Sequence, residues 1–355
     1  MYVEVDINAV RRNVRLARRM TGGLISGVVK SECYGHGLAL VKYVEDELDW
    51  FSVSSLDEAV ALRRLEVQKP IHVLGCLPEI SVDQPIVAGV FDCHYGLVDF
   101  TSNNIILTVA DLQSFLPIYK MQRTITIDIE INTGMNRTGV TPREFATIVS
   151  LIFSCKHITL RGVFTHFADG SDLKFCIKQL NMFEKITKNL PKEIIRHCSA
   201  TNFCKLPKKF YKDAIRLGLG MYGYGGEEFE PALDAGGRVI QINQIKAGGR
   251  IGYGNNIIEK DTRTATVDFG YGDGVPRSLS HRNGKIAVNG QLFEIVGTVC
   301  MDMTMIEIDD ADVSTGDKAY YISKYNDAAQ IAKDAGTIEY EILTGVNLRS
   351  KYCYR

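Results

Sequence analysis

Strand-like and helix-like segments alternate over the first two thirds of the chain, and this alternation restricts the fold more than any other feature. Thr124–Ile131 alternates with period two and is rich in β-branched residues, so it predicts a strand, and Pro142–Phe153 predicts the helix that follows. Roughly eight such units within the first ~225 residues favour a (β/α)8 TIM-type barrel, an α/β fold with parallel strands. A doubly wound open sheet is the alternative architecture.

Further strands are predicted at Leu24–Val29, Phe51–Ser54, Ile71–Leu74, Ile105–Val109, Ile158–Phe164, Glu193–His197 and Ala214–Leu219. Further helices are predicted at Leu38–Leu48, Leu56–Val67, Leu112–Met121 and Leu173–Asn189.

The composition and the predicted secondary structure of the chain change near Gly225. A polar stretch with glycine and proline, 225–231, is typical of a linker. The chain beyond it is rich in β-forming residues and closely spaced glycines, and Asn289-Gly290 between two strand-like runs indicates a hairpin. We therefore expect two domains, a barrel at 1–225 and a mostly-β domain at 226–355.

Composition excludes several classes of protein. The 355 residues include 41 Lys+Arg and 42 Asp+Glu, and a net charge of −1 does not favour a nucleic-acid partner. No apolar run approaches the ~18 residues that a membrane span needs, and no secretory signal is visible at Met1. The nine cysteines are scattered without a CxxC pair, so we expect reduced thiols, no metal site and a cytoplasmic location.

Several residues whose side chains could act in catalysis or binding follow predicted barrel strands. The active site of such a barrel lies at these strand ends. Lys30 ends an apolar strand and precedes a turn that contains Tyr34. Partial burial there would lower the lysine pKa and free its amine as a nucleophile or base, although a lysine that only reaches from a strand end to solvent is the alternative. Arg137 follows the strand at 124–131, and its guanidinium suits a substrate carboxylate.

Three later strand ends add a histidine and candidate phosphate ligands. His166 follows the strand at 158–164, and Ser199 and Thr201 follow the next one. The glycines after Arg216 would let backbone N–H groups approach a phosphate. Each signal alone is weak, but a barrel site draws its groups from several strands and its phosphate cradle from the late ones.

These motifs resemble the PLP-dependent alanine racemase family, where PLP is pyridoxal 5'-phosphate, and the resemblance covers essentially the whole chain. The residues that carry it are Val-Val-Lys30-x-x-x-Tyr34-Gly-His-Gly, Asn132-Thr-Gly-Met-Asn-Arg137, Thr-His166-Phe-Ala, Arg216-x-Gly-x-x-Met-Tyr-Gly, Ile251-Gly-Tyr253-Gly, Gly270-Tyr271-Gly-Asp-Gly and Cys300-Met301-Asp302.

The resemblance implies a racemase that interconverts L- and D-alanine and supplies D-alanine for peptidoglycan. It implies PLP bound to Lys30, reaction through an external aldimine, and two bases on opposite faces of the α-carbon, Lys30 and Tyr253. It also implies a homodimer in which the β-domain of each subunit completes the active site of the other, so that Tyr253 would come from the partner subunit. The partners would be a small amino acid and a second copy of the chain, with no nucleic acid and no membrane.

The resemblance also assigns the remaining site residues. His166 would hydrogen-bond Tyr253, and Arg216 would hydrogen-bond both His166 and the PLP ring nitrogen. The residues expected around the phosphate are Tyr34, Thr201, Gly218 and Leu219. The residues expected to bind the substrate are Arg137, the Met301 backbone N–H, Tyr271 and Asn347.

Three positions depart from the family pattern. Glu130 stands seven residues before Arg137, where the family often has a carbamylated lysine, and we expect it to orient Arg137 directly or through a water. Asn132 replaces the usual aspartate. Asn347 falls where the family often has a tyrosine at the substrate entrance, which leaves room for serine or a broader set of amino acids.

Two other classes resemble parts of the chain. A barrel-type PLP decarboxylase would place an acidic residue at the ring nitrogen, and Arg216 argues against that class. A PLP-carrying protein without turnover would resemble the barrel alone, and Tyr253 in the β-domain argues against that class.

Overall fold

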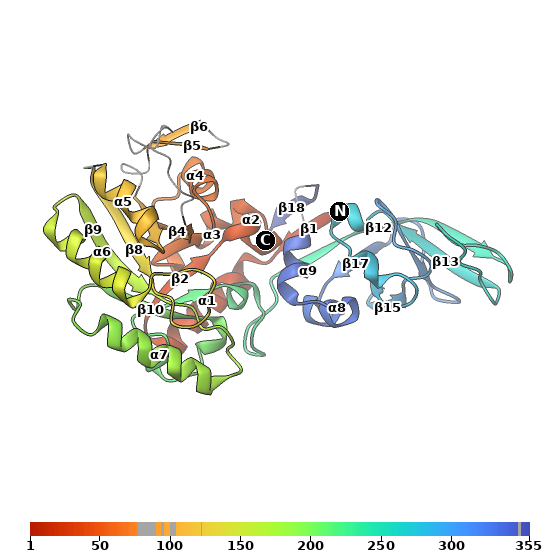
Figure 1. The fold of residues 1–355 in the computed structure, drawn as a ribbon. Helices are drawn as coiled ribbons and strands as arrows, with labels where there is room; N and C mark the ends of the chain where they lie inside the picture. The colour runs from red at the N-terminus through yellow and green to blue at the C-terminus, as the bar shows by residue number, and fades with distance from the viewer. Residues whose placement is uncertain (77–89, 94–95, 100–103, 122, 347–348) are drawn as a thin grey trace. The chain divides into compact units, whose positions relative to one another are not determined.

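The computed structural model describes all of the chain except residues 77–89, 94–95, 100–103, 122 and 347–348 (Figure 1). The chain forms two compact units. The barrel unit comprises Arg11–Lys30 and Val41–Met221, and the β-rich unit comprises Met1–Val10, Ser31–Leu40 and Tyr222–Arg355.

The barrel unit contains a closed ring of eight parallel strands in the order β10-β11-β2-β3-β4-β7-β8-β9 (Figure 1). The strands are β2 (Leu24–Val28), β3 (Trp50–Val53), β4 (Ile71–Cys76), β7 (Ile105–Val109), β8 (Ile125–Glu130), β9 (Ile158–Phe164), β10 (Ile195–Ala200) and β11 (Ala214–Leu217). Because β11 pairs with β2, the sheet closes, which confirms the predicted barrel and excludes the open sheet. Between β4 and β7, β5 (Val90–Cys93) and β6 (Gly96–Asp99) pair antiparallel.

Helices follow four barrel strands at the predicted positions, namely α4 (Leu56–Arg64), α5 (Leu112–Lys120), α6 (Pro142–Ser154) and α7 (Leu173–Thr187). A further helix, α1 (Ile7–Thr21), was not predicted and precedes β2. Helix α6 shows the local causes: Thr141 and Glu144 form a capping box, and Pro142 occupies the first turn. Its buried residues Phe145, Ile148 and Ile152 lie on one face, as the spacing predicts.

The single helix predicted at Leu38–Leu48 is wrong. This segment forms η1 (Leu38–Leu40), α3 (Val41–Val44) and η2 (Glu45–Glu47) in succession. Val44 leaves the helical region, with φ −120° and ψ 0°, so the regular hydrogen-bond ladder cannot continue through it. The apolar residues still bury themselves, which explains why their spacing imitates a longer helix.

The β-rich unit is organised around β12 (Leu233–Ile245), a strand that the sequence did not predict. β12 pairs antiparallel with β1 (Tyr2–Val5), β13 (Thr262–Val267) and β17 (Lys318–Ile322). β1 also pairs in parallel with β18 (Lys351–Tyr354), which joins the first and last residues of the chain in one sheet. The unit also contains β14 (Lys285–Val288), β15 (Gln291–Glu294), β16 (Thr304–Glu307), α8 (Ala328–Ala335) and α9 (Glu339–Gly345).

The predicted hairpin at Asn289-Gly290 is confirmed. These two residues join β14 to β15, and both have positive φ, 50° and 80°. That conformation suits the twist of a two-residue hairpin. Within the described residues, no helix is both long and apolar enough to cross a membrane.

Candidate active site

Lys30 lies two residues after the end of β2, at the C-terminal end of the barrel strands, where the sequence predicts it. The neighbouring backbone is held by the bond from the Val29 N–H to the Ser52 carbonyl, 2.9 Å. Burial lowers the pKa of Lys30, Arg137 lowers it further, and Glu58 partly offsets both. The amine is thereby easier to deprotonate, as a nucleophile or base requires.

The four residues after Lys30 adopt a left-handed turn. Ser31, Glu32, Cys33 and Tyr34 have φ values of 51–55°, a region that L-residues occupy at a cost of roughly 1–2 kcal/mol each. Side-chain hydrogen bonds stabilise the turn. The Tyr352 hydroxyl donates to the Gly35 carbonyl at 3.3 Å, the Tyr354 hydroxyl donates to the His36 carbonyl at 3.2 Å, and the Glu32 carboxylate accepts from the Leu38 N–H at 3.0 Å.

This turn orients Tyr34, the first residue predicted at the phosphate. Its side chain is buried, and its ring stacks on Tyr222 with a centroid distance of 5.0 Å. Backbone strain of this kind clusters at functional sites, where the surrounding structure maintains it.

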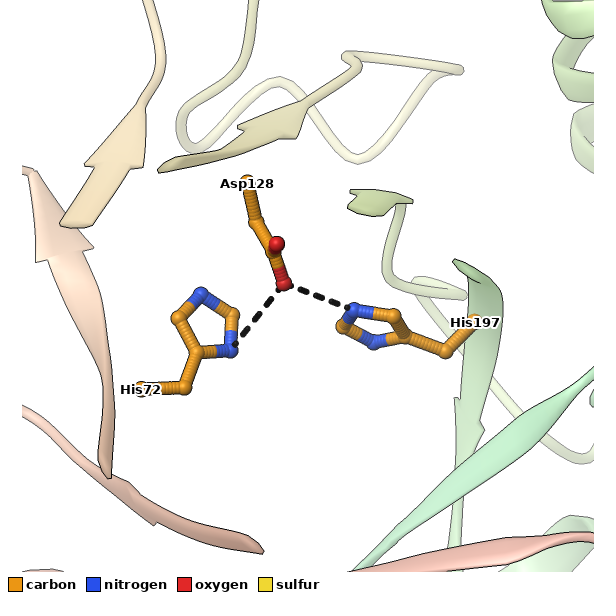
Figure 2. Close-up of side chains that lie close together, drawn as sticks. All are labelled: His72, Asp128 and His197. Atoms are coloured by element: carbon orange, nitrogen blue, oxygen red, sulfur yellow. Dashed lines mark hydrogen bonds and ion pairs between the residues drawn. The ribbon is translucent and has the colours of Figure 1, made fainter. Parts of the chain in front are cut away.

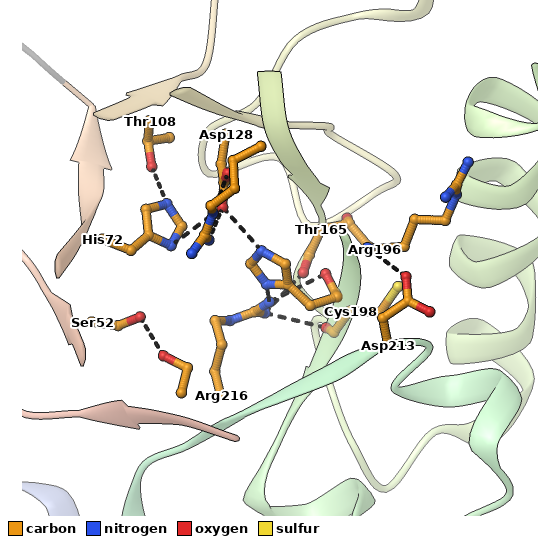
Figure 3. Close-up of polar contacts among 12 residues, drawn as sticks. Ser52, His72, Thr108, Asp128, Thr165, Arg196, Cys198, Asp213 and Arg216 are labelled. Atoms are coloured by element: carbon orange, nitrogen blue, oxygen red, sulfur yellow. Dashed lines mark hydrogen bonds and ion pairs between the residues drawn. The ribbon is translucent and has the colours of Figure 1, made fainter. Parts of the chain in front are cut away.

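Arg216, on β11, lies in a network of acceptors from neighbouring strands (Figure 3). Its Nη2 donates to the Thr165 and Cys198 carbonyls at 2.9 Å and 3.2 Å and to His166 Nδ1 at 3.1 Å. Its Nη1 donates to His197 Nδ1 at 2.7 Å and to the His197 carbonyl at 3.2 Å. Among the described residues Nε has no acceptor, so one N–H of a rigidly held guanidinium remains available to a ligand.

The protonation of His166 follows from this contact. Burial lowers the pKa of Arg216 to about 10, which still leaves it charged at neutral pH. His166 Nδ1 must therefore accept, and the ring proton resides on Nε2. Burial, followed by the charges of Arg216, Arg137 and Lys30, lowers the pKa of His166 to about 3, so the ring is neutral and its Nε2–H is a donor.

The candidate phosphate residues of the barrel unit occur where the sequence predicts them, after β10 and β11. Thr201 is buried, and its Oγ1 accepts from the Gly220 N–H at 3.1 Å, which leaves its hydroxyl proton available. Gly218 and Leu219 lie at the start of η6 (Leu219–Tyr222), whose first N–H groups have no acceptor within the helix. A hydroxyl and N–H groups at adjacent strand ends form a donor set suited to a phosphate.

The loop that carries Arg137 is closed by its own hydrogen bonds. The Asn132 carboxamide oxygen accepts from the N–H groups of Gly134 and Asn136 at 3.0 Å and 3.2 Å. The Asn132 N–H donates to the Val140 carbonyl at 3.2 Å, which closes the loop at its base. Asn132 thus orders this loop, while the Arg137 side chain is exposed at its tip.

The direct contact predicted between Glu130 and Arg137 is not formed. Glu130 is only 5% exposed at the end of β8, and no hydrogen bond or ion pair joins it to Arg137 within the described residues. The two residues differ in position: Glu130 is buried at the end of β8, whereas Arg137 is exposed in the loop that follows.

The remaining predicted residues belong to the β-rich unit. Tyr253 is 72% exposed although its backbone is fixed, since its carbonyl accepts from Asn256 Nδ2 at 2.7 Å and Thr298 Oγ1 at 3.3 Å. Tyr271 and Met301 lie on adjoining segments, because the Gly272 N–H donates to the Met301 carbonyl at 2.8 Å, and both side chains are exposed. Asn347 lies outside the described residues.

The sequence motifs do not point to Gln179, a fully buried residue on α7. Its Nε2 donates to Thr133 Oγ1 at 3.2 Å and to the His166 carbonyl at 3.0 Å, and its Oε1 accepts from the Ala168 N–H at 3.0 Å. It therefore fastens the ends of two barrel strands beside the site. A glutamine on the apolar face of a predicted helix is the signal that could have identified it.

Comparison with known proteins agrees with this arrangement. Residues 5–225 match the family described as "Alanine racemase, N-terminal domain", and residues 232–354 match "Alanine racemase, C-terminal domain". The alanine racemase of Carboxydothermus hydrogenoformans is 30% identical over 378 residues, covering 100% of this chain and 99% of the relative.

Solved structures agree at the level of the fold. The alanine racemase of Clostridium difficile 630 has a TM-score of 0.89 and 28% identity, covering 100% of this chain and 95% of that one. The Bartonella henselae alanine racemase with covalently bound pyridoxal phosphate shares the fold, with a TM-score of 0.87, 24% identity, and coverage of 100% and 99%. The protein belongs to the alanine racemase family.

Proposed function

We propose that this protein interconverts L- and D-alanine with PLP as its cofactor. The observation that carries the proposal is the hydrogen bonding of the Arg216 guanidinium. Both terminal nitrogens donate to acceptors in the barrel, while Nε–H remains available. Lys30, with its lowered pKa, follows a strand of the same barrel. An amine and a charged hydrogen-bond donor of this kind are the groups needed at the aldehyde and the ring nitrogen of PLP.

The residues of the chain fit this cofactor. Lys30 would bind it covalently, Arg216 Nε–H would donate to the ring nitrogen, and His166 would lie beside the ring. Thr201, Gly218, Leu219 and Tyr34 would hold the phosphate. When bound, PLP would withdraw electrons from the α-carbon of the amino acid and make its hydrogen more acidic.

Racemisation needs a proton-transfer group on each face of the α-carbon. Lys30 and Tyr253 would be these two groups. A tyrosine with a reference pKa of ~10 needs a donor that stabilises its anion. The neutral His166, with its proton on Nε2, supplies such a donor and would direct it at the Tyr253 oxygen. Because the charged Arg216 donates a hydrogen bond without giving up its proton, the ring nitrogen would remain unprotonated.

Substrate would be held by its carboxylate. Arg137 and the Met301 N–H would bind it, with Tyr271 and Asn347 nearby. A water would link the Glu130 carboxylate to Arg137. The working unit would be a cytoplasmic homodimer, and its product would supply peptidoglycan. The exposure of Tyr253, Tyr271 and Met301 supports the idea that they complete the site of a partner subunit.

The test uses purified enzyme loaded with PLP. Bound PLP should give a visible absorption band. Borohydride should fix the cofactor to Lys30, and peptide mass spectrometry would locate the reduced adduct. Chiral chromatography should show both alanine enantiomers converging on an equal mixture, with Lys30→Ala inactive. Serine serves as the comparison substrate. A reduced adduct on another residue, or full activity of Lys30→Ala, would refute the assignment, and a higher kcat/KM for serine would change the substrate.

A further inference from the structure

The interior of the barrel contains charged and polar side chains where branched apolar residues are usual. His72 on β4, Asp128 on β8 and His197 on β10 are 0% exposed and offer ligand atoms within 4.8 Å of one another (Figure 2). Burial of such groups is unfavourable unless each finds a partner. The proposed chemistry of the site uses none of these three side chains.

Asp128 accepts hydrogen bonds from Arg161 and His197, and His72 lies close to it. Arg161 donates to both carboxylate oxygens, from Nε to Oδ1 at 3.0 Å and from Nη2 to Oδ2. His197 Nε2 lies 3.3 Å from Oδ2, and His72 Nδ1 lies 3.7 Å from the same atom. Burial alone would raise the pKa of Asp128, but Arg161, His72 and His197 together hold it well below its usual value.

These contacts argue against a metal ion at the cluster. The Arg161 guanidinium already supplies the positive charge next to Asp128, and a second cation at the same oxygens would be repelled. His197 has no lone pair left for an ion, because Arg216 occupies Nδ1 and Nε2 faces Asp128.

The hydrogen bonds determine the tautomer of His197. Arg216 is charged and can only donate, so His197 Nδ1 accepts its Nη1–H at 2.7 Å. Burial, which outweighs the hydrogen bond that His197 donates to Asp128, lowers the pKa of His197 to about 4, so the ring is neutral at physiological pH. Its single proton therefore lies on Nε2 and is donated to Asp128 Oδ2.

We propose that Asp128 is a positioning residue for Arg216 that acts through His197. By accepting the Nε2 proton, the carboxylate keeps Nδ1 bare, and Nδ1 then holds Arg216 Nη1. In the other tautomer an Nδ1–H would face the guanidinium N–H, and the arginine would have to turn away. The inference rests on the proposed function in one respect, namely that Arg216 Nε–H donates a hydrogen bond to the ring nitrogen of PLP.

A series of variants separates this role from simple packing. His197→Phe keeps an aromatic ring against Phe164, which stacks on His197 at 5.0 Å, but removes both nitrogens. Asp128→Ala removes the acceptor. The amide oxygen of Asp128→Asn can take the place of Oδ2 and still accept from His197, while the bond from Arg161 Nε to Oδ1 is lost. Ser52→Ala is the control, since the buried Ser52 Oγ is paired with Ser26 Oγ at 2.6 Å and, among the described residues, with no member of the Asp128 network.

The measurements combine kinetics, absorption and NMR on the holoenzyme. Nitrogen-15 spectra of histidine-labelled protein, assigned with His197→Phe, should show His197 protonated at Nε2 alone at neutral pH. His197→Phe and Asp128→Ala should lower kcat on the order of ten- to a hundredfold, the value of a hydrogen bond to a charged group, with little change in KM. Both should shift the visible band of bound PLP. Asp128→Asn should recover part of the loss, and Ser52→Ala should change neither kcat nor the band.

Three results would overturn the proposal. They are a wild-type His197 that is charged or protonated at Nδ1, a His197→Phe enzyme with normal kcat and absorption, and a stoichiometric metal found by elemental analysis. If the variants fail to fold, the wild-type nitrogen-15 spectrum still decides. Absence of racemisation by the wild type would refute the proposed function instead, while the tautomer and the absorption band would continue to test Asp128.

Discussion

Replacing Gly139 by alanine should disturb the loop that carries Arg137 far more than it disturbs the rest of the barrel. Gly139 has φ +112°, and a Cβ there would lie 2.5 Å from the Asn132 backbone nitrogen and 2.9 Å from the Ile131 carbonyl carbon. These backbone atoms cannot easily retreat, because the Asn132 N–H donates to Val140 and the Val140 N–H donates to the Glu130 carbonyl at 2.8 Å. The loop must open instead.

The expected loss of stability has two parts. Holding an alanine at this φ costs roughly 1–3 kcal/mol, and the contact with backbone adds about 1–3 kcal/mol, as for other overpacked positions. Gly22→Ala separates the two parts, since Gly22 lies in the same unit with φ +61° and would meet nothing within 4 Å. That control should lose only about 1–2 kcal/mol, the cost of a left-handed L-residue.

Urea unfolding monitored by circular dichroism would measure the free energy of unfolding of both variants. Racemase kinetics would show whether the loop still holds Arg137 in place. Displacement of Arg137 by about 1 Å should raise the KM for alanine by roughly tenfold to a hundredfold. The visible absorption of bound PLP should not change. Equal losses of stability in Gly139→Ala and Gly22→Ala, together with an unchanged KM, would refute the reasoning.

The other predictions address the two bases, the dimer and the buried acids. Tyr253→Phe should lower racemisation by about 10²–10⁴-fold in steady-state assays, the usual share of a positioned acid–base group, and near-normal rates in both directions would contradict two bases. Mixing inactive Lys30→Ala and Tyr253→Phe chains should restore activity if sites are shared, and no recovery after verified subunit exchange would count against sharing. Glu130→Gln should raise the KM for alanine about tenfold, as loss of a charge-assisted hydrogen bond predicts, and unchanged kinetics would remove its proposed link to Arg137. Because the pKa of Asp128 is held below its usual value, its stabilisation is complete above the unfolded pKa of ~3.9 and is lost as the pH falls toward the folded pKa. In urea unfolding, the difference between wild type and Asp128→Asn should stay constant from neutral pH to about pH 5 and shrink below about pH 4.

Local patterns in the sequence were enough to predict the barrel. Period-two alternation in Thr124–Ile131 corresponds to β8, and the capping residues before α6 mark its start, because each depends only on neighbours in the chain. The positions of Lys30, His166 and Arg216 at strand ends followed from the same alternation. Their roles came from the resemblance of motifs to a known family.

Contacts between distant residues could not be predicted in this way. The pairing of β1 with β12 and β18 joins residues more than two hundred positions apart, and no local pattern records a partner at that separation. The left-handed turn at Ser31–Tyr34 contains no glycine among those four residues, and the tyrosines of β18 that donate to the carbonyls just after it are more than three hundred positions away.

The sequence by itself determined the strands of the barrel and the helices α4 to α7, and which side chains follow those strands, because periodicity and capping are local. Tertiary structure decided the protonation of those side chains. Arg216 makes both His166 and His197 accept at Nδ1, and it does so only because β9, β10 and β11 are neighbours in the closed barrel. Tertiary structure also showed Asp128 as the buried partner that sets the His197 tautomer, since a carboxylate in β8 and a histidine in β10 meet only across the barrel interior.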